Sequence, residues 1–220
     1  MEAATGVEIA SSREPRKAAR RTQAERRAAT RQRLLDAAIA CLAERGYADT
    51  TTIAVAAAAG LSRGAMLHHF GTKAELLRAV GEEVMRQTEA ILETSVAGGG
   101  ERERFLRAFD GALVQLDSPY FAAAAELLMA CRADPALRSL FADINREAGE
   151  RTEARLRRWA AAAGAMEGPR LDAFLDLLSV TVRGTFFLAG VEGGRERARS
   201  ALDALREAAR GLLPPAGRPR

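Results

Sequence analysis

Apolar residues recur every three or four positions along most of this chain, which is the repeat of an amphipathic helix. The first such stretch covers residues 22–45. Thr22 followed by Glu25 forms a capping box that predicts where this helix begins, and Gly46 predicts where it ends. The apolar face of this helix is formed by Leu34, Leu35, Ala38, Ile39 and Leu42.

Two much shorter helices are predicted in the next stretch. Thr51 or Thr52 caps the first of them, and Gly60 ends it by taking a left-handed conformation. Ser62 caps the second, which covers residues 63–70. Two helices joined by a short turn that contains glycine form a helix-turn-helix, in which the second helix approaches base edges with its first residues.

The remaining pattern predicts six longer helices and no strand, so we expect an all-α protein. Start signals such as Ser118-Pro119 and Asp134-Pro135 place proline at the first helical position. The expected helices cover residues 73–96, 101–116, 119–131, 135–163, 170–189 and 195–213.

The helix expected at residues 170–189 is apolar on more than one side. A helix that is apolar nearly all round must be covered on all sides, and in a chain of this size a second copy is the expected cover. The alternative is a central core helix of a monomer. The residues expected at the dimer interface are Leu171, Leu175, Leu178, Val182, Leu202 and Leu205.

Charge is unevenly distributed along the 220 residues, although the net charge is only +4. Residues 13–33 hold nine basic and two acidic side chains. Because this basic segment adjoins the helix-turn-helix, it favours contact with phosphate over the alternative of a solvated tail. Residues 1–21 are expected to form a flexible arm in which Arg20 and Arg21 contact DNA.

Candidate DNA contacts concentrate in and around the second short helix. Arg63 suits a bidentate hydrogen bond to guanine, and His68 lies further along the same helix. Lys73, at the start of the next helix, suits a phosphate. His68 and His69 point apart because they are neighbours on a helix, so they cannot bind one metal ion together. A small three-helix unit that binds nothing is the alternative.

The sequence TT-x3-VA-x2-AGLSRGAMLHHFGTK-x2-LL, which begins at Thr50, closely resembles the DNA-binding domain of TetR-family transcriptional regulators. The resemblance is strong over residues 34–77 and extends beyond them only in helical layout. Leu67 stands where the family often has a tyrosine, so the phosphate contact of that hydroxyl is in question here. The matching positions are Thr50-Thr51, Ala59 to Ser62, Ala65 to Phe70, and Thr72-Lys73 with Leu76.

The resemblance implies a homodimeric repressor that blocks a promoter at an inverted-repeat operator and is released by a small molecule. It divides the chain into a DNA-binding domain at residues 22–72 and a regulatory and dimerisation domain at residues 73–215. A regulator or activator without a functional effector pocket is the alternative. The expected DNA-binding residues are Thr51, Thr52, Ser62, Arg63, Gly64, Ala65, Leu67, His68 and Lys73, with Arg20 and Arg21 of the arm.

The apolar stripes of the larger domain favour an apolar or weakly polar effector. Cys131 is a further soft lining residue. Some aromatic residues are available to line a pocket, although ordinary core is the favoured interpretation of each: Phe105, Phe109, Tyr120, Phe121, Phe141, Trp159, Phe174 and Phe186.

Other classes of protein find little support in the sequence. Both histidines lie on the predicted recognition helix, and the chain has no catalytic triad, phosphate-binding loop or metal-ligand spacing, so we expect neither an enzyme nor a cofactor. Its two cysteines are far apart. No apolar run approaches the length of a membrane span, and a cytoplasmic protein is expected. The expected partners are double-stranded DNA, a second copy of the chain and a small apolar effector.

Overall fold

The computed structural model describes residues 22–165, 167–188 and 191–215, and every regular element in these ranges is an α-helix. The all-α class predicted from the sequence is confirmed. The arm at residues 1–21 lies outside the described residues. In chain order the helices are α1 (Gln23–Asp49), α2 (Thr52–Ala58), α3 (Arg63–His69), α4 (Lys73–Ser95), α5 (Glu101–Gln115), α6 (Pro119–Ala133), α7 (Pro135–Ala162), α8 (Pro169–Leu188) and α9 (Gly194–Arg210).

Helix α1 begins and breaks where the sequence predicts. The Thr22 hydroxyl accepts the Glu25 N–H at 3.2 Å, and the Glu25 carboxylate accepts the Thr22 N–H at 2.7 Å, which is the predicted capping box. Gly46 interrupts the helix with φ of 79° and ψ of 175°, values that are open to glycine but strained for other residues. The last residues of α1, up to Asp49, therefore turn away from the main helix axis.

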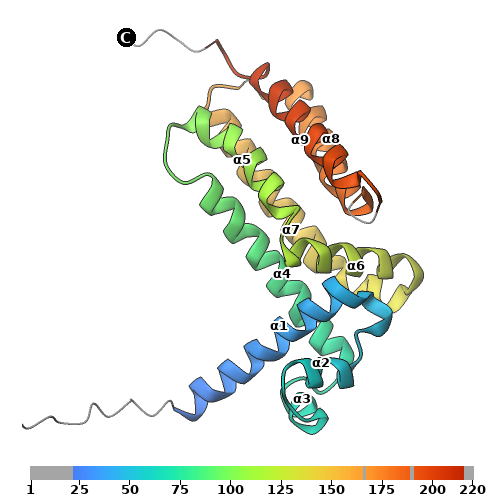
Figure 1. Cartoon of the computed structure of the whole chain (residues 1–220). Helices are drawn as coiled ribbons and strands as arrows, with labels where there is room; N and C mark the ends of the chain where they lie inside the picture. Colours follow the sequence, from blue (N-terminus) through green and yellow to red (C-terminus); the bar gives the residue numbers. More distant parts are fainter. Residues whose placement is uncertain (1–21, 166, 189–190, 216–220) are drawn as a thin grey trace, which may run out of the picture.

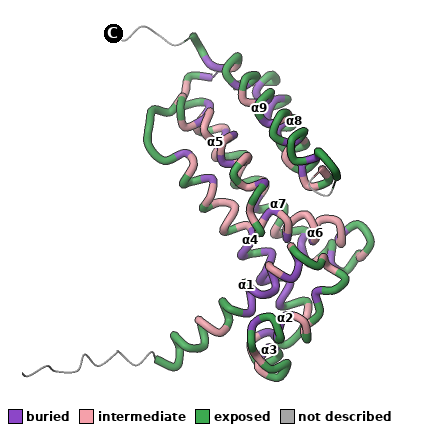
Figure 2. Tube along the Cα trace, viewed as in Figure 1, coloured by how far each residue is buried: buried purple, intermediate pink, exposed green. Residues whose placement is uncertain are grey.

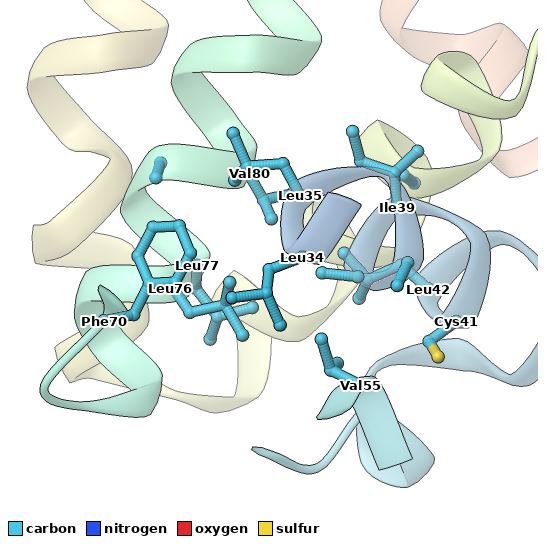
Figure 3. Packing of buried hydrophobic residues seen from close by; sticks show 14 of the residues in the cluster. Leu34, Leu35, Ile39, Cys41, Leu42, Val55, Phe70, Leu76, Leu77 and Val80 are labelled. Carbon is cyan, nitrogen blue, oxygen red and sulfur yellow. The ribbon is translucent and has the colours of Figure 1, made fainter. Parts of the chain in front are cut away.

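The predicted apolar face of α1 forms the centre of the first hydrophobic core. Its leucines and isoleucine are nearly inaccessible to solvent, and they pack against α2, the end of α3 and the first half of α4 (Figure 3). The side chains brought together are those of Leu34, Leu35, Ile39, Leu42, Val55, Phe70, Leu76, Leu77 and Val80.

This first core continues into the helices that follow the helix-turn-helix. Ala123, Leu127 and Cys131 of α6 belong to the same cluster, as do Leu137 and Phe141 of α7. The boundary expected after residue 72 therefore crosses a continuous apolar core. Helix α1 packs directly against α6 as well as against α4.

A second core fills the far half of the molecule. The end of α4 contributes Leu92 and Val96, which pack with residues of α5, α7, α8 and α9. Helix α9 packs against α8 and α5, and the ion pair between Arg206 and Asp110, 2.9 Å long, joins α9 to α5. Figure 1 shows α8 and α9 side by side at the end of the molecule remote from α2 and α3.

The end of α9 differs from the expected helix for a simple reason. Helix α9 ends at Arg210 rather than at residue 213, and the Gly211 N–H turns back to the Ala208 carbonyl at 3.0 Å. Leu213 is nevertheless buried, so the apolar pattern continues past the end of the helix. No helix in the described ranges combines the length and the apolar content needed to cross a bilayer.

Candidate nucleic-acid interface

Side-chain caps define the short helices of the helix-turn-helix. The Thr51 hydroxyl accepts the Ala54 N–H at 3.1 Å, which begins α2 at Thr52. The Ser62 hydroxyl accepts the Ala65 N–H at 3.1 Å and begins α3. Each cap satisfies one backbone donor that a helix of seven residues would otherwise leave to solvent.

The turn between α2 and α3 is held from both sides. Gly60 has φ of 64°, and the next N–H, that of Leu61, donates to the Ala56 carbonyl at 2.9 Å. Arg33 of α1 donates from its guanidinium to the Ala59 carbonyl at 2.6 Å. Arg33 thus binds the turn itself, which fixes α2 and α3 relative to α1.

The two sides of α3 differ sharply in exposure (Figure 2). Met66 and the following Phe70 are buried in the first core. The predicted contact residues on the other side are accessible to a partner, since Arg63 and His68 are exposed and Leu67 is 38% exposed. The helix therefore offers solvent a face with a guanidinium near its N-terminus, as a recognition helix requires.

The remaining predicted contacts around the helix-turn-helix are divided between exposed and half-buried positions. Thr51, Ser62 and Gly64 are exposed, whereas Thr52 and Ala65 are half-buried. Ser62 and Thr51 already use their hydroxyls as caps, so a second hydrogen bond to phosphate would use the donor proton that capping leaves free.

Lys73, the expected phosphate contact, is not freely exposed. Its side chain is half-buried, and Nζ lies 4.5 Å from the centre of the Tyr47 ring. Burial lowers the pKa of Lys73. The ammonium at the start of α4 is thereby held in one place by a cation–π contact rather than being free in solvent.

Basic side chains of α1 border the same region. Arg31 lies over the Phe70 ring at 4.9 Å from its centre. Burial lowers the pKa of half-buried His69, and so do the nearby charges of His68, Arg27 and Arg31. The neutral form of His69 is favoured because positive charge already surrounds it, and a phosphate approaching here meets two guanidinium groups.

Two features of this region were not predicted from the sequence. Ile53, at the start of α2, is 61% exposed although isoleucine usually packs inside. The Tyr47 ring lies under the Lys73 ammonium. Arg20 and Arg21, the predicted arm contacts, lie outside the described residues.

The aromatic residues proposed for an effector pocket pack into the core. Phe105 and Phe109 meet edge to face with ring centres 6.1 Å apart, and Phe174 lies 6.1 Å from Phe109. Phe121 and Phe186 stack at 4.5 Å in a separate cluster. These rings fill the space between helices through contact with one another.

Two more of the proposed pocket aromatics lie apart from these rings and from each other. Tyr120 packs on the first core and Trp159 on the second. The structure therefore does not gather these seven aromatic residues around one space. The expectation that they share a pocket is wrong, because five of them pack ring against ring while Tyr120 and Trp159 belong to different cores.

A small hollow does lie between α4, α6 and α7. Its volume is about 30 Å³, and Phe141 and Cys131, both considered from the sequence, are among its lining residues. Burial raises the pKa of the Cys131 thiol. An open groove of about 350 Å³ lies between α4 and α7, and Met85 and Ile144 line both the groove and the hollow.

The residues expected at a dimer interface also need correction. Leu171, Leu175 and Leu178 point into the second core, as does Leu205 of α9, whereas Leu202 is buried in the smaller third cluster. They are wrong as partner-facing residues because α8 turns this face toward α9 and the rings of α5 within the same chain. Val182, the sixth expected residue, is half-buried.

The apolar residues that α8 exposes lie on its other side. Leu177 is 54% exposed, Val180 is 66% exposed and Phe187 is 52% exposed. Periodicity alone could not separate the two sides, because apolar residues occur on both. The helix is apolar nearly all round, as predicted, and the described part of the chain leaves one of its apolar sides uncovered.

A helix-turn-helix with an exposed arginine on its second helix, bordered by basic side chains, defines a DNA-binding protein of the helix-turn-helix class. The family model described as "Bacterial regulatory proteins, tetR family" matches residues 34–80, from the middle of α1 into α4. A solved structure described as a TetR-family transcriptional regulator from Pectobacterium atrosepticum is 30% identical, with a TM-score of 0.62, over 91% of this chain and 100% of the other.

Two curated relatives are also named as helix-turn-helix transcriptional regulators. The HTH-type transcriptional regulator CymR of Pseudomonas putida is 40% identical over 121 residues, which are 54% of this chain and 59% of CymR. The HTH-type transcriptional repressor AcnR of Corynebacterium efficiens is 40% identical over 68 residues, which are 30% of this chain and 36% of AcnR. This chain thus aligns with less than two thirds of the length of either relative.

This chain belongs to the TetR family of DNA-binding transcriptional regulators. The resemblance inferred from the sequence motif is confirmed, and the family is one of regulators rather than enzymes.

Proposed function

We propose that this regulator is a homodimeric repressor that reads an inverted-repeat operator with α3. The observation that carries the proposal is the exposed side of α3, where Arg63 and His68 face solvent while Met66 and Phe70 hold the helix to the core. Arg63 would bind a guanine edge, and Lys73 would bind a phosphate. The other proposed contacts are Thr51, Thr52, Ser62, Gly64, Ala65, Leu67 and His68, with Arg20 and Arg21 of the arm.

The proposed dimer forms through the uncovered side of α8. Its exposed small and apolar residues are spaced alternately four and three positions apart, which is the spacing of a helix–helix seam. Two copies related by a two-fold axis would bury this side against itself and present two α3 helices to successive major grooves. The residues of this side, called the α8 seam below, are Ala173, Leu177, Val180, Gly184 and Phe187.

Release by a small molecule would involve α4, because α4 contributes to both cores. The proposed entry is the groove between α4 and α7, where Met85 and Ile144 separate it from the hollow beside Cys131. A molecule that moves these two side chains would join the two spaces. Coupling of about 1–3 kcal/mol between effector and operator is the usual scale.

A repressor without an effector is the second candidate, and the small hollow favours it. Ligand pockets usually have volumes of about 300–1,000 Å³, whereas the hollow measures about 30 Å³. A regulator of this kind would stay on its operator until its own concentration falls. Compounds tested for release of the operator would distinguish the two candidates.

Selection of duplex DNA from a random pool by the purified protein, at two salt concentrations, tests the proposed function. The expected result is an enriched inverted repeat that is still bound at the higher salt concentration. A control selection uses a variant that lacks two of the proposed basic contacts, exposed Arg63 and half-buried Lys73, as Arg63→Ala with Lys73→Ala. Binding by the wild-type protein that enriches no sequence and vanishes as salt rises would contradict the proposal.

A further inference from the structure

Helix α6 lies between the hollow and the DNA-binding helices. Ala124, Leu127, Leu128 and Cys131 form its side of the hollow. The same helix packs closely against α1 (Figure 1). Leu127 and Cys131 also belong to the first core. A displacement of α6 would therefore move α1, and with it the helix-turn-helix, without requiring a movement of α4.

One polar side chain of α6 reaches the connection between α1 and α2. Half-buried Glu126 accepts the Tyr47 N–H with Oε2 at 3.1 Å. A Cβ at Gly46 would lie 3.0 Å from the same oxygen, so a larger residue at position 46 would crowd this contact. The carboxylate thus takes up a backbone donor that the break in α1 leaves without a helical partner.

The segment that Glu126 holds leads directly to two proposed DNA contacts. Buried Thr50 ties its end, since the Thr50 hydroxyl donates to the Gly46 carbonyl at 2.7 Å, and Thr51 then caps α2. On the other side, the Tyr47 ring supports the Lys73 ammonium at 4.5 Å. Glu126 therefore helps to fix the position of the Tyr47 ring, and the Lys73 ammonium, which is proposed to bind a phosphate, packs on that ring.

We propose that Glu126 is a positioning residue for DNA binding, through which α6 controls the placement of the Tyr47 ring and hence of Lys73. The inference rests on the proposed DNA-binding function. With the contact intact, Lys73 is held where it neutralises a phosphate. When the contact is lost, the segment after Gly46 is released and Lys73 loses its support, so the protein binds DNA less tightly.

The test uses the full-length protein and the duplex enriched in the selection. Glu126→Ala should lower the affinity about 2- to 30-fold, the usual effect of a mutation that modulates coupling. It should also reduce the slope of log affinity against log salt by about one, the share of a single phosphate contact. Glu126→Gln keeps an oxygen that accepts the Tyr47 N–H and should restore most of the affinity.

A double-mutant cycle separates this role from a general loss of structure. In a Lys73→Ala background, Glu126→Ala should cause little further loss of affinity, because its effect acts through Lys73. Glu150→Ala, which removes an exposed carboxylate paired with Arg146 on α7, is the matched control and should bind DNA normally. Hydrogen exchange of the Tyr47 amide should accelerate in Glu126→Ala alone among these glutamate variants.

Three outcomes would overturn the inference. Unchanged affinity and salt slope in Glu126→Ala would show that the contact has no part in DNA binding. An equal loss with and without Lys73 would show that Glu126 acts by another route. If the wild-type protein itself enriches no duplex, the proposed function fails and the inference fails with it, whereas the first two outcomes leave the proposed function intact.

Discussion

Met66 and Leu67 are consecutive residues of α3 with opposite surroundings. Met66 has no exposed surface and belongs to the first core, whereas Leu67 is 38% exposed on the side proposed to meet DNA. A seven-residue helix has little stability of its own, so its position depends on the few side chains that it buries. Met66 therefore serves stability, and Leu67 is free to serve recognition.

Alanine at each position should separate these roles. Met66→Ala should lower the free energy of unfolding by about 2–5 kcal/mol, because it leaves a cavity in the first core. Leu67→Ala should change it by about 0.5 kcal/mol or less, as is usual for surface positions. Urea unfolding measures the first quantity, and titration of the selected duplex should show weaker binding by the correctly folded Leu67→Ala. Equal stability of the two variants would contradict the orientation of α3.

The uncovered side of α8 is the main feature at the scale of the element. Gly184 has open space where a Cβ would stand, and three large apolar residues flank it along the helix. An exposed apolar strip on a helix that is also apolar inside is typical of a site that another protein surface covers. The proposed dimer would bury this strip far from α3.

Charged substitutions on the two sides of α8 should have different results. Leu177→Glu with Val180→Glu places two charges on exposed positions and should give folded monomers in sedimentation experiments. Leu178→Glu, one residue away, should unfold the protein, because Leu178 is buried in the second core and its charge would have no partner. Intact dimers of the Leu177→Glu, Val180→Glu variant at low micromolar concentration would move the interface elsewhere.

At the scale of the whole molecule, positive charge gathers at the DNA-binding end. Arg27 and Arg31 of α1 border α3, and the sequence before them continues the basic run. Elsewhere most arginines of the described helices pair with acidic side chains, as Arg151 does with Glu89 at 2.9 Å. The unbalanced charge therefore lies where the phosphate backbone is proposed to bind.

The arm should contribute affinity through charge rather than sequence. Arg20→Ala with Arg21→Ala should reduce the slope of log affinity against log salt by about two, one for each lost phosphate contact. Arg20→Lys with Arg21→Lys preserves both charges and should keep the slope. Isothermal titration over a range of salt concentrations measures it. If the slope of log affinity against log salt is unchanged in the alanine variant, Arg20 and Arg21 do not contact DNA and the arm is not part of the interface.

Local signals in the sequence predicted the local structure well. The capping box at Thr22, the cap at Ser62 and the turn at Gly60 depend on residues within a few positions of one another, and the structure confirms each of them. The apolar face of α1 was also predictable, because its apolar residues recur every three or four positions along one helix. Short-range chemistry of this kind is independent of how distant helices pack.

What the sequence could not supply was the choice among equivalent apolar residues and the contacts between distant segments. Leu177 and Leu178 look alike in a sequence, and only the packing of α8 against α9 and α5 decides which is exposed. The contact of Glu126 with Tyr47 joins residues 79 positions apart, and no local pattern signals it. The expectation of one aromatic pocket was wrong for the same reason. The sequence does not show that Phe105, Phe109 and Phe174 pack against one another, or that Phe121 stacks on Phe186.

Repeating the DNA selection with Arg63→Ala beside the wild-type protein tests the central claim most directly. Arg63 is exposed at the start of α3, so the variant should fold normally. The account predicts that both proteins enrich the same inverted repeat, with the variant losing preference at one base pair in each half-site, worth about 1–3 kcal/mol of discrimination. Identical preference at every position of the operator would contradict the assignment of α3 as the recognition helix.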